Sequence, residues 1–127
     1  MLQKEVIDRL CAEPGGGDYG RLTVMTQYRC QPEWLFDVPP EAFSPPPKVW
    51  SAVVGFVPHA EDPPPALFAA MEKLTAAAFG QRRKMLRTNL QDYLGRLQLQ
   101  EDELTKRAQD ISVARYLEWA SVLAASS

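Results

Sequence analysis

Three consecutive prolines, Pro45 to Pro47, stand between two apolar stretches and restrict what this part of the chain can become. Proline fixes φ at about −65° and has no backbone N–H donor, so neither a sheet interior nor a helix interior accommodates the run. Each proline also favours extended geometry in the residue before it. We therefore predict a stiff, extended segment that holds the flanking Phe43 and Lys48 at nearly fixed positions, for packing or for a ligand.

Periodicity and breakers predict short elements on both sides of the prolines. Residues 1–12 place apolar side chains at helical spacing, and this predicted helix begins without a cap or lead-in, so we expect a portion of a longer protein. The glycine-rich stretch 13–20 predicts a loop, and 21–30 fits either a strand or, as we favour, a short helix. Runs rich in valine and aromatic residues predict two strands, at 32–40 and 49–58.

The proline-rich, polar stretch 59–66 is the best boundary between two parts of the chain. After it the apolar spacing predicts helices, at 67–80, 81–97, 101–108 and 112–125. Ser112 is the expected N-cap of the last one. The residues thus predict a part at 1–60 that contains the strand pair, and a small all-helical part at 61–127.

Composition excludes several classes of protein. A hydrophobic fraction of 46% is ordinary for a globular chain, and a formal charge of −2 argues against a generally basic surface while allowing a local basic patch. No apolar run approaches the roughly 20 residues that cross a bilayer. Cys11 and Cys30 lack CxxC spacing, so we expect free thiols and a cytoplasmic protein. The sequence contains no phosphate loop, Ser–His–Asp set or zinc pattern, so we predict no metal site and no complete active site.

The densest group of cations lies at the predicted start of a helix and consists of Arg82, Arg83, Lys84 and Arg87. Positive charge there opposes the helix macrodipole, and a site that tolerates it often binds phosphate. A solvated helix face explains the same pattern, so the residues alone leave both readings open. Phe43 is similarly open between a core position and a platform for a stacked base, and Lys48 between the surface and a phosphate contact.

Five stretches of the sequence resemble one known family. They are "MLQKEVIDRL", "YGRLTVMTQY", "LFDVPPEAFSPPPKVWSAVVGFVPH", "FGQRRKMLRTNL" and "ISVARYLEWA", in this order. Together they resemble the C-terminal part of bacterial members of the rRNA adenine dimethylase family. This resemblance implies an α/β fragment, namely the last strand pair and helices of a Rossmann-like class I methyltransferase, followed by a small all-α domain. It also implies an enzyme that uses S-adenosylmethionine to dimethylate N6 of two adjacent adenines near the 3′ end of 16S rRNA, during small-subunit maturation.

The resemblance further assigns roles to individual residues. Phe43 matches the aromatic residue that stacks on the flipped adenine, and Pro45, Pro46 and Lys48 belong to the RNA-contacting loop around that base. The basic stretch that docks on the ribosomal subunit corresponds to Arg82, Arg83, Lys84 and Arg87. In the family, the cofactor loop and the Asn-Leu-Pro-Tyr catalytic motif precede the point where this sequence begins. We therefore expect no catalytic or cofactor-binding residue here, and no activity from this chain alone.

Two strands without the rest of a sheet expose an apolar edge, so we also predict self-association. Two alternatives to the enzyme fragment remain at this point. One is a stand-alone rRNA- or ribosome-binding module without methyl transfer. The other is the antibiotic-resistance branch that acts on large-subunit rRNA, although the amino-acid sequences of residues 38–49 and 79–87 favour the housekeeping branch that acts on 16S rRNA.

Overall fold

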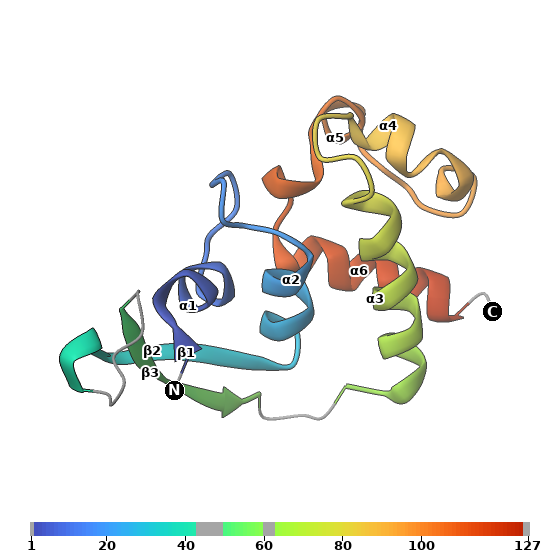
Figure 1. Cartoon of the computed structure of the whole chain (residues 1–127). Helices are drawn as coiled ribbons and strands as arrows, with labels where there is room; N and C mark the ends of the chain where they lie inside the picture. Colours follow the sequence, from blue (N-terminus) through green and yellow to red (C-terminus); the bar gives the residue numbers. More distant parts are fainter. Residues whose placement is uncertain (1, 43–49, 60–62, 126–127) are drawn as a thin grey trace.

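The structure, a computed structural model, describes residues 2–42, 50–59 and 63–125 (Figure 1). The helices and strands of these residues are, in chain order, β1 (Leu2–Gln3), α1 (Lys4–Leu10), α2 (Arg21–Gln27), β2 (Cys30–Val38), β3 (Ser51–Pro58), α3 (Pro65–Ala78), α4 (Leu86–Asn89), α5 (Glu101–Leu104) and α6 (Val113–Ala125). Short 3-10 turns lie at Pro40–Ala42, Gln91–Tyr93 and Ala108–Asp110. The predicted strands and the favoured helix at 21–30 are confirmed, whereas the first predicted helix is shorter and follows a two-residue strand.

The strands form an antiparallel sheet in the order β1-β3-β2. β2 and β3 pair along their lengths, from Cys30 opposite Pro58 to Val38 opposite Ser51, with a shift in register between Trp34 and Phe36. Helices α1 and α2 contact this sheet and lie on one side of it in Figure 1. The large apolar side chains that remain about half exposed on these strands and beside them are Trp34, Leu35, Phe36, Trp50, Phe56 and Val57.

The main core lies among α2, α3 and α6 and includes residues from both sides of the predicted boundary. Tyr19 and Val24, from the first part, are buried together with Leu74 and Tyr116 from the second. The Tyr19 hydroxyl donates a hydrogen bond to the carbonyl of Ile111 at 2.6 Å, which ties the two parts together. The helices after residue 63 are therefore fixed relative to α2 by a shared core, and the division at 1–60 and 61–127 stays a prediction.

The long helix predicted over 81–97 is wrong. Only α4 and a 3-10 turn form within it, because contacts distant in sequence compete with helix continuation. The Asn89 side-chain amide donates to the carbonyls of Ala78 and Gln81, both at 2.9 Å, and so closes the turn after α3. Residues 82–84 consequently lie in a turn before α4 and not on a helix. The last predicted helix is confirmed as α6, and its Ser112 cap accepts the backbone N–H of Arg115 at 3.2 Å.

Candidate nucleic-acid interface

Four of the predicted site residues lie outside the described part of the chain: Phe43, Pro45, Pro46 and Lys48. Their roles therefore stay predictions. The neighbouring described residues show where the chain enters and leaves this segment, because Val38 at the end of β2 pairs directly with Ser51 at the start of β3.

The other predicted site residues lie in what we call the basic turn, residues 81–87. Its backbone is held at both ends. The carbonyl of Gln81 accepts the Lys84 N–H at 2.9 Å and the Asn89 side chain, and the N–H of Leu86 donates to the carbonyl of Lys106 at 2.8 Å. Leu86 itself is completely buried. The turn is thus fixed by contacts with α4 and with the chain after α5.

Arg82 is an exposed residue, but its guanidinium lies against the loop before α2. Its guanidinium donates hydrogen bonds to the carbonyls of Tyr19 at 2.8 Å and Gly17 at 3.4 Å, and it lies 5.9 Å from the centre of the Phe79 ring. The loop approaches so closely that a Cβ atom added at Gly20 would lie 3.0 Å from Arg82 Nη1. Arg82 therefore connects the basic turn to the loop before α2.

The remaining cations of the basic turn are Arg83, Lys84 and Arg87, which we call the exposed cations. All three side chains are exposed, and none makes a hydrogen bond or an ion pair with any residue that the structure describes. No described carboxylate neutralises them, so their charges are available to an anionic partner. Chains of phosphate groups are the natural partners of such a cluster.

This difference between neighbouring arginines gives a testable contrast. Arg82→Ala is expected to lower the free energy of unfolding by about 1–2 kcal/mol, because two backbone carbonyls lose their donor. Arg83→Ala should change it by less than about 0.5 kcal/mol, as surface substitutions without contacts usually do. Urea denaturation of the two variants measures both values. Equal losses of stability would contradict the placement of Arg82.

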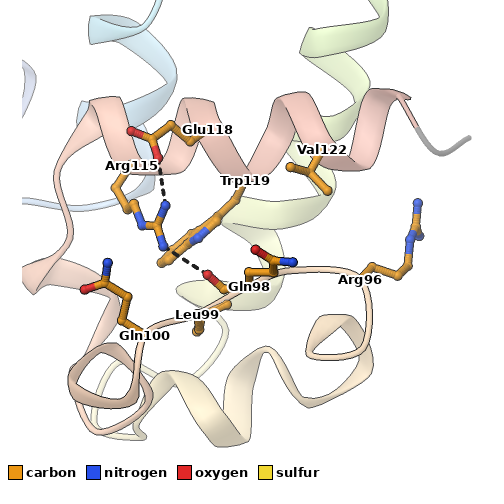
Figure 2. Close-up of a pocket in the computed structure, with 8 residues that line it drawn as sticks. All are labelled: Arg96, Gln98, Leu99, Gln100, Arg115, Glu118, Trp119 and Val122. Atoms are coloured by element: carbon orange, nitrogen blue, oxygen red, sulfur yellow. Dashed lines mark hydrogen bonds and ion pairs between the residues drawn. The ribbon is translucent and has the colours of Figure 1, made fainter.

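Arg115 of α6 holds α5 through a bidentate ion pair that the sequence analysis missed. Its Nε and Nη2 atoms each lie 2.8 Å from a carboxylate oxygen of Glu103, whose side chain is buried. The same guanidinium donates to Glu118 at 2.7 Å and to the carbonyl of Gln98 at 3.1 Å, and it stacks over Trp119 (Figure 2). A groove of about 610 Å³ lies beside this network, between α6 and residues 96–100.

One sequence signal for this network was available. Glu103 also accepts the backbone N–H of Gln100 at 2.8 Å, and the spacing Gln-x-x-Glu before a short helix is a capping pattern. Arg115 lies 12 residues further along the chain, so no local pattern indicates it as the partner.

The ion pair makes stability depend on pH. Hydrogen bonds from Arg115 are the largest cause that lowers the pKa of Glu103 below its ordinary 4.5, whereas burial acts in the opposite direction. Because the folded pKa is the lower one, the stabilisation is present above pH 4.5 and is lost as the pH falls through the folded pKa. In Glu103→Gln, the free energy of unfolding, measured with urea, should therefore fall less steeply as the pH is lowered below 4.5 than it does in the wild type. The control is Glu101→Gln, an exposed glutamate of the same helix, and equal flattening by both would contradict the assignment.

Comparison with known proteins decides the family. The family model for ribosomal RNA adenine dimethylases matches residues 1–125. The chain belongs to this family.

The curated relatives of this chain are longer proteins. Ribosomal RNA small subunit methyltransferase A of Gluconobacter oxydans is 51% identical over 99% of this chain and 42% of its own length. The protein of the same name from Laribacter hongkongensis is 62% identical over 74% of this chain and 36% of its own length. The protein of the same name from Pseudomonas aeruginosa is 47% identical over 98% of this chain and 47% of its own length. The chain thus spans less than half the length of these relatives, whose names describe enzymes that methylate ribosomal RNA.

Two solved structures share the fold of this chain. A dimethyladenosine transferase from Plasmodium falciparum superposes with a TM-score of 0.72 at 21% identity, over 92% of this chain and 53% of that one. The 23S rRNA methyltransferase ErmE gives a TM-score of 0.60 at 22% identity, over 95% of this chain and 52% of that one. The predicted α/β class with a small sheet is confirmed, while a separate all-α domain stays a prediction. No described helix is both long and apolar enough to cross a membrane.

Proposed function

We propose that this chain is the C-terminal, RNA-facing part of an S-adenosylmethionine-dependent rRNA adenine N6,N6-dimethyltransferase. The substrate of the parent enzyme would be two adjacent adenines in a hairpin near the 3′ end of 16S rRNA, modified in the cytoplasm during small-subunit maturation. The observation that carries this proposal is the set of exposed cations on a fixed turn, in a chain of the rRNA adenine dimethylase family.

In this proposal Arg83, Lys84 and Arg87 contact phosphates of the ribosomal RNA. Each contact releases condensed counterions, so affinity would fall steeply with salt concentration. Because the backbone of the turn is held by Gln81 and Leu86, little ordering is needed when RNA binds. Phe43 would stack on the flipped target adenine, with Pro45, Pro46 and Lys48 beside it, since stacking offsets part of the cost of flipping a base.

We assign no binding site for S-adenosylmethionine to the described residues. Their glycine-rich segment, 13–20, joins helix α1 to helix α2, whereas the glycine-rich cofactor loops of Rossmann-like folds follow a strand. This segment therefore does not have the setting of such a cofactor loop, and we propose that the remainder of the parent enzyme binds S-adenosylmethionine, so that this chain alone would not transfer methyl groups.

Family membership favours this assignment over a stand-alone ribosome-binding module. The choice between the branches of the family rests on identity. Curated relatives named for the small subunit are 47–62% identical to this chain, which supports the small-subunit branch.

A direct test is fluorescence anisotropy with a labelled hairpin from the 3′ end of 16S rRNA. We expect the 127-residue chain to bind this RNA and the affinity to fall as salt is raised. In a plot of log affinity against log salt concentration, each phosphate contact should contribute about −0.7 to −0.9 to the slope. An affinity that does not depend on salt, or no binding at low salt, would refute the docking role.

We also propose that the isolated chain self-associates through its sheet. Phe36 pairs opposite Val53, the residue after Ala52 on β3. Ala52 pairs with Asp37, whose carboxylate lies 3.7 Å from Lys4 of α1. Because successive residues of a strand point to opposite faces, Phe36 and Val53 lie on the face away from α1. No described strand pairs with the outer edge of β2, so a second copy can cover both the edge and the face.

Phe36→Glu is therefore expected to shift the chain towards the monomer in sedimentation velocity, because a carboxylate on a packed apolar face is not solvated. Phe36 is 57% exposed, and Phe68 on α3 is exposed to a similar extent, at 44%. Phe68→Glu is the matched control and should leave the association unchanged. A wild-type chain that stays monomeric as its concentration rises would contradict the proposal.

A further inference from the structure

The two shortest helices of the described chain stand next to the exposed cations. α4 and α5 each contain four residues, too few to be stable alone, so contacts from elsewhere must hold both. The Met85 side chain does not cap α4, and the N–H of its first residue, Leu86, bonds instead to the carbonyl of Lys106. α5 is held by the bidentate pair between Glu103 and Arg115.

These contacts form one continuous connection from α6 to the basic turn. Arg115, on the well-packed helix α6, fixes Glu103 of α5. The N–H of Lys106 donates to the Glu103 carbonyl at 3.1 Å, so Lys106 follows α5 closely. The Lys106 carbonyl in turn accepts the N–H of Leu86, within the basic turn, at 2.8 Å. Each step is a hydrogen bond or an ion pair between described residues.

We propose that Arg115 is a positioning residue for RNA binding, acting through Glu103, α5 and the Lys106 carbonyl to fix the turn that presents Arg83, Lys84 and Arg87. The inference rests on the proposed function, since it concerns how the exposed cations meet RNA.

Direct contact of Arg115 with RNA is the competing explanation, and its surroundings argue against it. Its charge is matched by two carboxylates, those of Glu103 and Glu118. Its side chain is only 24% exposed and lies over the Trp119 ring. The guanidinium is therefore committed to contacts within the protein.

A pair of glutamate substitutions separates positioning from charge. Glu103→Gln and Glu118→Gln each remove one negative charge beside Arg115, so simple electrostatics predicts slightly tighter RNA binding for both. Positioning predicts that Glu103→Gln binds the labelled 16S hairpin about three- to tenfold more weakly, a size typical of energetic coupling between sites. Glu118→Gln, which keeps the Glu103 pair, should not weaken binding. Unchanged or tighter binding by Glu103→Gln would overturn the inference.

A second arm uses the triple variant Arg83→Ala, Lys84→Ala, Arg87→Ala as background. If α5 acts through the basic turn, Glu103→Gln should have no further effect on affinity there. An equal loss in both backgrounds would overturn the inference. The triple variant alone tests the proposed function: if it binds RNA like the wild type, the docking role of the exposed cations fails, whatever the glutamate variants do.

Amide hydrogen exchange tests the connection without RNA. In Glu103→Gln, and in the milder Arg115→Lys, which keeps the charge but loses the bidentate geometry, we expect faster exchange of the Leu86 amide. The Phe79 amide, bonded to the Thr75 carbonyl at the end of α3, is the internal control and should be unaffected. Unchanged exchange at Leu86 in both folded variants would overturn the inference.

Discussion

Replacing the three exposed cations, Arg83, Lys84 and Arg87, by alanine is expected to weaken binding of the 16S hairpin by about a hundredfold at roughly 0.1 M salt. The reason is the release of counterions by each phosphate contact. Losing three contacts should make the negative slope of log affinity against log salt concentration shallower by about 2 to 3. The measurement is a series of anisotropy titrations at increasing salt. Stability should hardly change, because these side chains make no hydrogen bonds or ion pairs with described residues.

The control removes cations elsewhere on the surface. Arg29 follows α2 and Lys73 lies on α3, and both side chains are exposed. Alanine at these two positions lowers the net charge but leaves the basic turn intact, so the salt slope should change by less than about 1. The same loss per removed charge in both variants would mean that RNA responds to total charge and not to the basic turn.

Trp119→Ala is expected to have the largest effect on stability, a loss of about 3–5 kcal/mol in the free energy of unfolding. Trp119 is only 2% exposed, and its ring meets that of Tyr116 edge to face with 5.6 Å between ring centres. Removing the indole leaves a cavity in the core that α2, α3 and α6 share. Since domains are stable by about 5–15 kcal/mol, the variant would be largely unfolded in moderate urea.

Val122 supplies the matched control for this substitution. It lies one turn further along α6, is 46% exposed, and as alanine should change stability by less than about 0.5 kcal/mol. Urea denaturation followed by circular dichroism compares the two variants. A loss below about 1 kcal/mol for Trp119→Ala would show that the core described here is not what holds α6.

Local patterns predicted the elements whose stability is local or set by one apolar face. The strand pair follows from valine, aromatic and proline placement, and α3 and α6 follow from their apolar stripes. The interruption of 81–97 could not be predicted, because it depends on the Asn89 side chain reaching Ala78 and on a carbonyl from Lys106. Both partners are defined only once the chain has folded.

The candidate site shows the same limit at single residues. Arg82 and Arg83 are equivalent as sequence and both are exposed, yet Arg82 donates a hydrogen bond to the carbonyl of Tyr19, whereas the Arg83 side chain bonds to no described residue. Which arginine side chain is bonded within the protein is decided by the approach of the loop before α2, a contact 63 residues apart in the chain. The ion pair between Glu103 and Arg115 could likewise not be predicted from apolar periodicity. Periodicity places each residue on its own helix but does not indicate which other helix it contacts.

The measurement that tests the central proposal most directly is a calorimetric titration of one sample of the chain, first with S-adenosylmethionine and then with the 16S hairpin. We expect no binding heat for the cofactor and a saturable, salt-sensitive isotherm for the RNA. Binding of the cofactor without binding of the RNA would contradict the assignment of this chain as the RNA-facing part of a dimethyltransferase.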